Sequence, residues 1–364
     1  MMIYALLIFT IAYTIFVLFI ISGLFRHNIL PVSNLETLPF VSVIIAARNE
    51  EENLPRLLDD LINQEYPSNK FEIIIINDRS YDSTLEILLE ASENYAFIKI
   101  ITVDEESKHM TPKKNAIDLG VKESKGEVIL ATDADCRVGP LWIASMTYSL
   151  INKNRIIIGY SEISKIKETL FETYQKIDFL AILSANAGAA GWDHYWSGTG
   201  QNLAYYKRDY FQIGGFDPVK DKISGDDMYL VQSISKLKKG YIHIDPNSHV
   251  KTKAMTSIKD FINQRIRWSS NSKANYKNSP LFFSFLMISF IENLLILLSL
   301  FFALKAYLIW GLKIILDSLV ILFGAKLFER SFDFKTYLFW AALQPIYIPI
   351  IGVLGLLNKF SWKK

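Results

Sequence analysis

The first 25 residues carry no charged side chain, and this run limits the possible folds more than any other feature. The segment MMIYALLIFTIAYTIFVLFIISGLF exceeds the roughly 20 apolar residues that a helix needs to cross a bilayer. It lacks the basic start and the small-residue cleavage site of a signal peptide, so residues 1–25 are predicted to form a retained N-terminal transmembrane helix. Because Arg26 and His27 follow this helix, the positive-inside rule places the middle of the chain in the cytoplasm.

Further apolar segments lie toward the other end of the chain, at 281–304, 307–328 and 337–357. We expect residues 281–357 to supply two or three membrane spans. The middle segment is the weakest span, because it carries Lys313 and Asp317. The charge rule does not choose between two and three spans, since basic residues occur both in the last loop and at the C-terminus, at Lys359, Lys363 and Lys364.

Composition excludes some classes of protein. Lysine and arginine number 39, aspartate and glutamate 37, and the net charge is +2. A nucleic-acid-binding surface usually shows as a basic patch, so no nucleic-acid partner is expected. The single cysteine, Cys136, excludes an intrachain disulfide. It has no Cys or His partner at close spacing, so a metal–thiolate site is not expected either.

Residues 40–255 have the pattern of a globular α/β domain. Short apolar runs alternate with segments of helical spacing, the runs being FVSVIIAA, FEIIIIND, FIKIITV and GEVILATD. Strands that alternate with helices predict a mostly parallel sheet covered on both faces. The continuous apolar character of the strands agrees with burial on both faces.

Polar side chains follow several of these strands. Arg48 and Glu50 come after the first strand, Asp78 after the second, and Asp133 and Asp135 after the fourth. Open parallel sheets bind ligands at the carboxyl ends of their strands, so these groups are expected to converge on one site. Single members of such a set also serve as helix caps, and Asp82 and Ser83 have the positions of caps.

The pair Asp133 and Asp135 suggests a metal. Two carboxylates one residue apart can approach one hard cation if the chain turns between them, and Mg²⁺ or Mn²⁺ completes such a shell with water and substrate phosphates. A divalent ion there would offset the charge that grows on a departing diphosphate. The implied substrate is a nucleotide diphosphate derivative.

Five stretches in order carry a resemblance to a known family: VSVIIAARNEEENL, IIIINDRSYDST, PKKNAIDLG, ATDADC, and SGDDMYL followed by QRIRW. Over roughly residues 40–270 the chain resembles membrane-bound glycosyltransferases of family 2. The resemblance implies an α/β domain of the GT-A (nucleotide-diphospho-sugar transferase) fold at 40–255, flanked by transmembrane helices. It also implies a UDP-sugar or GDP-sugar donor.

The resemblance implies roles for individual residues. Nucleotide-sugar binding would fall to Arg48, Glu50, Asp78, Lys113 and Asp133, and metal binding to Asp133 and Asp135. Asp227 matches the catalytic base, and Asp226 takes the place of the usual Glu. The diphosphate and the acceptor would lie under Gln264, Arg267 and Trp268. The sequence departs from the family pattern at Asn77, where many members have Asp, and at Pro112, where Gly is common.

Some of these residues have structural alternatives. Asp226 and Asp227 could cap the helix predicted for MYLVQSISKL, and Trp268 could belong to an interfacial aromatic belt. Trp192 and Trp196, with His194 and Tyr195, are candidate acceptor or donor contacts because aromatic faces stack on sugar rings, and packing on the membrane surface is equally open. His249 could complete the metal shell, as in some related folds, or be a surface histidine.

Residues 256–278 have the pattern of a basic amphipathic helix, which can lie in the lipid headgroup layer and would place the site at the bilayer face. The leading hypothesis is a multi-pass enzyme of the inner (plasma) membrane with a cytoplasmic catalytic domain. It would be an inverting, metal-dependent hexosyltransferase of the cell envelope that glycosylates a lipid or glycan acceptor. The alternatives are a processive polysaccharide synthase and a noncatalytic membrane scaffold on the same fold.

Overall fold

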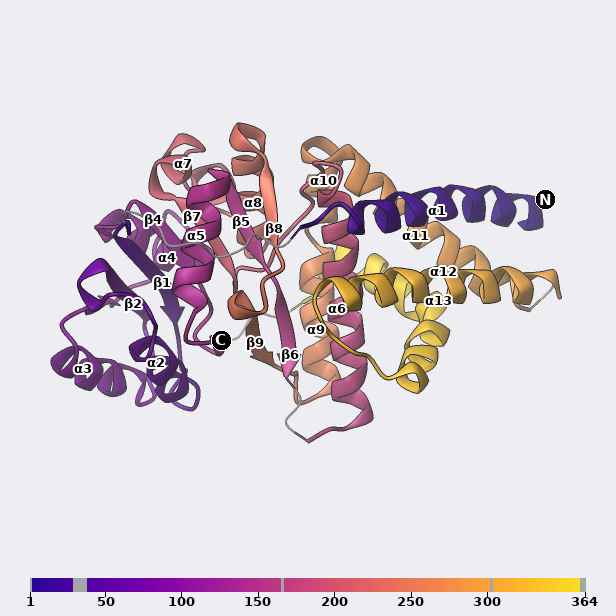
Figure 1. Ribbon diagram of the computed structural model, residues 1–364. Coiled ribbons are helices and arrows are strands. Elements are labelled where there is room, and N and C mark those ends of the chain that lie inside the picture. The colour runs from indigo at the N-terminus through magenta and orange to yellow at the C-terminus, as the bar shows by residue number, and fades with distance from the viewer. Residues whose placement is uncertain (1, 29–37, 165–166, 302–303, 361–364) are drawn as a thin grey trace. The chain divides into compact units, whose positions relative to one another are not determined.

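The computed structural model describes residues 2–28, 38–164, 167–301 and 304–360 (Figure 1). The chain divides into two compact units. One unit contains Asn28–Glu162 and Ser197–Lys253, and the other contains Met1–His27, Ile163–Trp196 and Ala254–Lys364. We call them the α/β unit and the helical unit. Lys363 and Lys364, two of the basic residues used above to predict on which side of the membrane the C-terminus lies, are outside the described residues.

The α/β unit is built on a seven-stranded sheet of order β3-β2-β1-β4-β7-β5-β8. The strands are β1 (Val41–Ala47), β2 (Phe71–Asp78), β3 (Ile98–Val103), β4 (Val128–Ala131), β5 (Ile156–Gly159), β7 (Leu203–Tyr206) and β8 (Gly240–His243). Strand β7 runs antiparallel to β4 and β5, and the other pairs are parallel. The predicted mostly parallel α/β sheet is confirmed, and the antiparallel β7 is the feature that the strand pattern did not show.

Both faces of the sheet are covered, as the apolar strands predicted. All eight residues of β2 are buried. On one face Ile45 and Ile73 belong to the main core with Leu57 of α2 (Leu54–Ile62) and Trp142 of α5 (Trp142–Lys153). On the other face α4 (Pro112–Glu123) packs against β1 and β2. Burial on both faces leaves the strand ends as the place where polar side chains can gather.

The remaining elements of this unit connect and flank the sheet. They are α3 (Thr84–Asn94), α7 (Lys207–Gln212), α8 (Asp226–Lys238), β9 (Val250–Lys253) and the 3₁₀ helices η1 (Ser68–Lys70), η2 (Asp217–Val219) and η3 (Pro246–Ser248). Strand β6 (Ser161–Ser164) is where the chain leaves this unit. The β1–β2 register runs from Val41↔Phe71 to Ala47↔Asn77, so Arg48 and Asp78 follow at one edge of the sheet.

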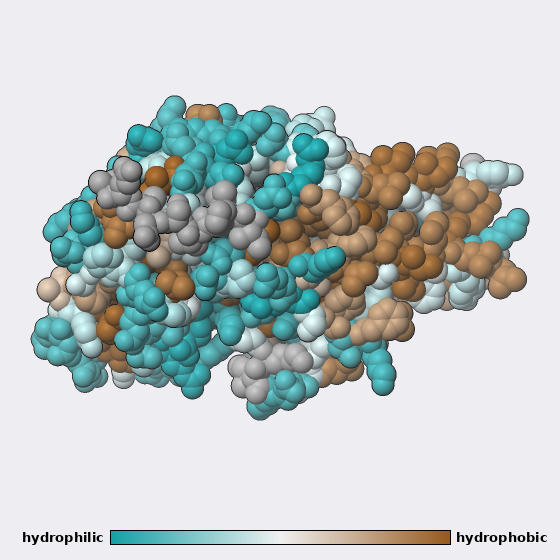
Figure 2. All heavy atoms as spheres, viewed as in Figure 1, coloured by the Kyte–Doolittle hydropathy of each residue, from teal (hydrophilic) through white to brown (hydrophobic). Residues whose placement is uncertain are grey.

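The helical unit contains the apolar segments. Its helices are α1 (Met2–Leu24), α6 (Leu170–Ala190), α9 (Ile258–Ser269), α10 (Ser272–Asn278), α11 (Pro280–Ser299), α12 (Lys305–Leu327) and α13 (Phe334–Leu356). In the described part of the chain, α1, α11, α12 and α13 are long and apolar enough to cross a membrane. Figure 2 shows hydrophobic side chains gathered on the surface of these helices, and Ile8, Ile11 and Ile15 of α1 are each more than 60% exposed.

Helix α6 lies inside the range 40–255 predicted for the globular domain, yet it packs with α1, α12 and α13 in the helical unit. Small residues allow this packing. A Cβ on Gly188 would come within 2.4 Å of the Ile20 carbonyl oxygen, so α1 and α6 touch through their backbones. Arg26 Nε then donates to the Gly191 carbonyl at 2.8 Å, which fixes the end of α1 against the end of α6.

Three charged residues of the apolar helices, Glu292, Lys313 and Asp317, are buried and have hydrogen-bond partners. Lys313 Nζ lies 2.5 Å from Asp317 Oδ2, and Tyr13 OH donates to Asp317 Oδ1 at 2.6 Å. Thr10 Oγ1 donates to Glu292 Oε1 at 2.8 Å. Polar groups in a bilayer are tolerated where they face other helices and find partners. Lys313 and Asp317, the two charged residues in the middle of α12, thus have partners inside the helical unit, and the segment is still apolar enough to cross a membrane.

The predicted amphipathic helix at 256–278 is two helices in the structure, α9 and α10, with Ser270 and Asn271 between them. Ser257 caps α9, because its side chain accepts a hydrogen bond from the Asp260 backbone N–H. Helix α13 contains both Pro345 and Pro349 and continues through them.

Candidate active site

The turns after β1 and β2 are joined by hydrogen bonds. The Asn49 backbone N–H donates to Ser80 Oγ at 3.0 Å, and the Glu50 backbone N–H donates to Thr84 Oγ1 at 2.7 Å. Asn49 has a φ of 55°, in the left-handed region where Asn is among the better tolerated residues. Its side-chain oxygen accepts from the Tyr81 backbone N–H at 3.0 Å. These bonds fix Arg48 and Glu50 beside the end of β2.

Asp78 ends β2 and is only 6% exposed. Arg79 Nε donates to Asp78 Oδ1 at 2.9 Å, and Arg48 Nη1 lies 4.0 Å from Asp78 Oδ2. Arg79 also pairs with Glu106 at 3.0 Å. The structure therefore brings together Arg48 and Asp78 as expected. Arg79, whose partner is a neighbour in sequence, is an additional contact that the family pattern did not single out.

Asn77, one of the two departures from the family pattern, is 2% exposed and holds no solvent-facing position. Pro112, the other departure, is the first residue of α4. Proline suits this position, because the backbone N–H of a first helical residue has no partner within the helix. The substitution thus leaves the start of α4 intact.

The first turn of α4 contributes Lys113, which connects two acidic segments. Lys113 Nζ donates to Asp133 Oδ1 at 2.8 Å and lies 4.0 Å from Asp226 Oδ2. Burial lowers the pKa of Lys113, but the carboxylates of Asp133 and Asp226 outweigh it and hold the pKa above the ordinary value. Residues from α4, from the turn after β4 and from α8 thus meet at one ammonium group.

The turn after β4 presents Asp133 and Asp135. The Cys136 backbone N–H donates to the Asp133 carbonyl at 3.1 Å, so the chain does turn between the two carboxylates. Neither carboxylate is fully buried. Burial, followed by the charge of Asp135, raises the pKa of the Cys136 thiol, which keeps it protonated and unlike a metal thiolate.

A divalent metal fits this pair by the chemistry of its donors. Two half-buried carboxylates suit Mg²⁺ or Mn²⁺ when substrate phosphates supply further ligands. Among the described residues, no group of three or more His, Cys, Asp or Glu side chains could hold a metal alone. A metal held by two protein carboxylates would take its remaining ligands from water and substrate phosphates.

His249 is 6% exposed and packs edge-on against Tyr160 at 4.9 Å, so the surface-histidine alternative is wrong. Arg137 and Lys251 form an antiparallel bridge. The bridge pairs the segment just after Asp135 with the strand just after His249.

Asp226 and Asp227 lie in the first turn of α8. Gly225 is the residue before the helix, with a φ of 82°, so the two aspartates are not its N-cap. Asp227 Oδ1 accepts from the Met228 backbone N–H at 2.7 Å. Burial, followed by the charge of Asp226, raises the pKa of Asp227 to about 6. A carboxyl with this pKa is ionised at neutral pH and accepts protons more readily than an ordinary aspartate.

Two contacts of this site had no signal in the sequence. Gly200 lies against it, since a Cβ there would be 3.8 Å from Asp226 Oδ2 and 3.8 Å from Lys113 Nζ. Lys114 is 1% exposed, and its Nζ donates to the Lys222 carbonyl, in the loop that leads to α8. A lysine beside a motif lysine is expected on the surface, and only the fold shows that this one is buried.

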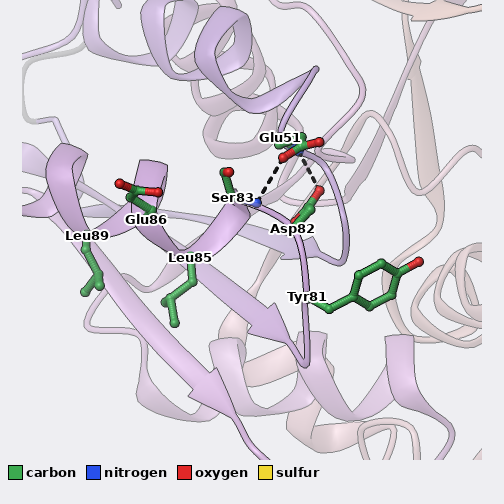
Figure 3. A pocket seen from close by; sticks show the side chains of 7 residues that line it. All are labelled: Glu51, Tyr81, Asp82, Ser83, Leu85, Glu86 and Leu89. Atoms are coloured by element: carbon green, nitrogen blue, oxygen red, sulfur yellow. Dashed lines mark hydrogen bonds between the residues drawn. The ribbon is translucent and has the colours of Figure 1, made fainter.

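A shallow hollow of about 670 Å³ lies at the start of α3 (Figure 3). The Ser83 backbone N–H donates to Glu51 Oε2 at 2.9 Å, and the Glu51 backbone N–H donates to Asp82 Oδ2 at 3.2 Å. Of the two expected caps, Ser83 holds the N-cap position of α3 but its side chain makes no capping bond, whereas Asp82, one residue earlier, accepts from the Thr84 backbone N–H at 3.0 Å. The hollow is lined by Glu51, Tyr81, Asp82, Ser83, Leu85, Glu86 and Leu89, none of which is a predicted site residue.

Gln264, Arg267 and Trp268 lie on α9 of the helical unit. Trp268 packs against Phe179 of α6 at 6.0 Å, and the Arg265 guanidinium lies 4.2 Å from the centre of the Trp268 ring. The contact partners of Trp268 are therefore protein side chains of its own unit. Trp268 is nevertheless partly exposed, so the aromatic-belt alternative stays a prediction.

The two acceptor candidates differ. Trp196 is 1% exposed and stacks on Phe282 at 5.0 Å and on Phe285 at 5.1 Å, so an acceptor contact by this ring is a wrong prediction. The Trp196 ring is buried because these two phenylalanines of α11 enclose it. Trp192 is 40% exposed, stacks on Phe19 and lies under the Arg26 guanidinium at 4.1 Å.

The fold has a match among solved structures. The mannosyltransferase PcManGT of Pyrobaculum calidifontis, solved with GDP-Man and Mn²⁺, matches with a TM-score of 0.61 over 99% of this chain and 100% of its own, at 19% identity. The chain therefore has a GT-A-like glycosyltransferase fold. The glycosyl transferase family 2 pattern matches residues 42–223, half of the chain. The chain belongs to glycosyl transferase family 2.

Relatives of known sequence agree with this assignment. The probable glycosyltransferase YdaM of Bacillus subtilis is 29% identical over 267 residues, which cover 70% of this chain and 62% of that protein. The chain thus spans less than two thirds of the length of this relative. The dolichyl N-acetyl-α-D-glucosaminyl phosphate 3-β-D-2,3-diacetamido-2,3-dideoxy-β-D-glucuronosyltransferase of Methanococcus voltae is 27% identical over 243 residues, covering 64% of this chain and 72% of its own.

Proposed function

We propose that this chain is an inverting, metal-dependent hexosyltransferase that moves a sugar from a UDP- or GDP-sugar to a hydroxyl of a lipid-linked or membrane-associated acceptor. The observation that carries the proposal is the meeting of Lys113, Asp133 and Asp226 beside Asp227. This arrangement supplies acidic oxygens for a metal, a cation for phosphate, and a carboxylate of raised pKa. All of them follow the carboxyl ends of the strands or begin the helices there.

On this proposal the nucleotide lies across the ends of β1 and β2. Asp78 accepts hydrogen bonds from the base, beside Arg48 and Glu50. Asp133 and Asp135 would hold Mg²⁺ or Mn²⁺, with His249 as a further proposed ligand. A divalent ion bound there would offset negative charge on the diphosphate. Lys113 Nζ, which donates to Asp133 Oδ1 in the structure, supplies a cation for the phosphate oxygens.

Asp227 is the proposed general base. Its carboxylate takes the proton of the acceptor hydroxyl as the acceptor oxygen forms a bond with the anomeric carbon. The bond from that carbon to the phosphate oxygen breaks, and the nucleoside diphosphate leaves with the electron pair. A single displacement of this kind inverts the configuration at the anomeric carbon. Asp226 raises the pKa of Asp227 and faces Lys113, so its proposed role is to tune the base.

Gln264, Arg267 and Trp268 are proposed to contact the diphosphate and the acceptor. A guanidinium presents a planar set of donors suited to phosphate oxygens. Trp192 is retained as a proposed acceptor contact because its ring is partly exposed.

The lipid-linked acceptor is supported by the Methanococcus voltae relative, whose name states a dolichyl phosphate substrate. The apolar helices α1, α11, α12 and α13 are compatible with residues 1–25 and 281–357 as membrane segments. The α/β unit would lie in the cytoplasm and residues 256–278 at the interface. The plasma membrane is the proposed location. The alternative enzyme is a processive polysaccharide synthase, whose acceptor is a growing polymer. The alternative outside the enzymes is a noncatalytic membrane scaffold.

The test is a donor screen with the full chain in lipid vesicles that contain Mn²⁺ and a membrane lipid extract. Mass spectrometry of the organic phase identifies a glycosylated lipid, and NMR of the product gives the configuration of the new bond. A glycolipid with one added sugar and inverted configuration is expected. A water-soluble polymer favours the synthase, and no nucleotide release with any UDP- or GDP-sugar favours the scaffold.

A further inference from the structure

Arg265 occupies a position between Gln264 and Trp268 that the family motif leaves open. It lies on α9, is 4% exposed and has contacts on several sides. Its Nη1 donates to Gln264 Oε1, and its guanidinium carbon lies 4.2 Å from the centre of the Trp268 ring and 4.5 Å from that of Phe261. One buried cation therefore touches two of the three residues that the proposed function places at the diphosphate and the acceptor.

Asp178 of α6 fixes this cation. Arg265 Nε donates to Asp178 Oδ2 at 2.7 Å. Trp340 Nε1, from α13, donates to Asp178 Oδ1 at 3.0 Å. Both oxygens of the carboxylate thus have partners, and the carboxylate is itself 4% exposed. A planar guanidinium held through Nε by a fixed carboxylate has little freedom to rotate.

These side chains contact one another in series, from α13 through α6 to α9. Trp340 orients Asp178, Asp178 orients Arg265, and Arg265 limits the rotamers of Gln264 and Trp268. Phe179, the next residue after Asp178, packs against Trp268 with the ring centres 6.0 Å apart. All of these residues belong to the helical unit.

We infer that Asp178 is a positioning residue for sugar transfer, which acts through the Arg265 guanidinium to hold Gln264 and Trp268 in their productive orientation. The inference rests on the proposed function of those two residues. It differs from a merely structural ion pair in one respect. If the pair served only to neutralise charge in the interior, removal of both charges would restore the enzyme. If it positions the motif, removal of both charges restores the fold and leaves activity low.

The experiment compares variants of the full chain in lipid vesicles. Asp178→Asn removes the charge at nearly constant volume and is expected to lower kcat by about 10- to 100-fold, the range typical of small misplacements of catalytic groups. Nucleoside diphosphate binding to the α/β unit is expected to stay within about twofold, since no residue of that unit is altered. Asp178→Glu keeps the carboxylate and is expected to retain more activity than Asp178→Asn.

The decisive variant carries Asp178→Asn and Arg265→Gln together. It is expected to unfold at a temperature closer to the wild type than Asp178→Asn alone, because it buries no unpaired charge, and to keep the low kcat. This double variant also decides the question if Asp178→Asn fails to fold. Trp340→Phe removes one hydrogen bond and is expected to lower kcat by a smaller factor than Asp178→Asn.

The matched control is Asp209→Asn. Asp209 is 1% exposed and lies 3.1 Å from Lys238 Nζ, so it is a second buried carboxylate with a lysine partner, in the α/β unit. Its loss is expected to lower stability and leave kcat within about twofold. Recovery of wild-type kcat in the double variant, or equal kcat for Asp178→Asn and Asp209→Asn, overturns the inference. A wild-type chain that transfers no sugar overturns the proposed function instead.

Discussion

The raised pKa of Asp227 gives the proposed mechanism a measurable pH dependence. Burial and the neighbouring charge of Asp226 raise this pKa to about 6. A general base works only in its ionised form, so kcat/KM should follow the ionised fraction. With a pKa of about 6 that fraction is about 0.9 at pH 7 and about 0.1 at pH 5, so kcat/KM should fall roughly tenfold between them. An ordinary aspartate, with a pKa near ~3.9, would stay more than about 0.9 ionised throughout this interval.

The assay is nucleoside diphosphate release measured from pH 4.5 to 8 at low donor concentration, with protein stability checked at each pH. Asp226→Asn provides the internal comparison. Because the Asp226 carboxylate raises the pKa of Asp227, its neutralisation should move the acidic limb of the profile to lower pH, whatever the change in maximum rate. A wild-type profile that stays flat down to pH 5, or an unchanged limb in Asp226→Asn, would refute the reasoning.

Other expected outcomes concern the metal and the membrane helices. Chelation of divalent ions, or Asp133→Asn, should lower the transfer rate by about 100-fold or more in the donor assay, and activity that survives both argues against a metal. Gly188→Leu should cost about 1–3 kcal/mol in thermal unfolding in detergent, because its Cβ would lie 2.4 Å from the Ile20 carbonyl oxygen, and an unchanged Tm contradicts the close helix contact. Lys313→Met should cost about 3–5 kcal/mol, since it leaves Asp317 buried with Tyr13 as its remaining partner, whereas Lys313→Met with Asp317→Leu should recover most of the loss.

The sheet could be predicted because its strands are continuous β-branched runs. The run IIII of β2 is buried on both faces, and such a run has few other folded environments. The antiparallel β7 (Leu203–Tyr206) could not be predicted, because its four residues follow a stretch rich in glycine and aromatics with no clear period. Its place between β4 and β5 depends on pairing between distant segments of the chain.

The part of the site that lies at the strand ends could be predicted from the sequence. Asp78 and Asp133 follow strands whose carboxyl ends meet at one edge, so their gathering follows from parallel topology. The contacts among side chains from different elements were not predictable. The pairing of Lys113 with Asp133, and the position of Gly200 beside Asp226, depend on how loops pack after the sheet has formed.

The aromatic and charged residues of the apolar region show the same limit. A tryptophan beside a glycine-rich turn has the composition of a sugar-binding residue, yet Trp196 is enclosed by two phenylalanines of α11. Lys313 and Asp317 count against a membrane span when they are read alone, and their mutual hydrogen bond removes the objection. Phe282 and Phe285 lie more than 80 positions from Trp196, and Tyr13, which donates to Asp317, lies on another helix. The four-residue spacing of Lys313 and Asp317, by contrast, can be seen in the sequence.

The central claim is that Asp227 takes the acceptor proton in a sugar transfer. Its most direct test is the rate at which Asp227→Asn moves labelled sugar from the preferred UDP- or GDP-sugar into membrane lipid, compared with the wild-type chain under the same conditions. A loss of about 100- to 10,000-fold is expected, with nucleotide affinity unchanged, because the variant keeps the shape of the side chain and lacks the base. Transfer by Asp227→Asn at the wild-type rate would contradict the account.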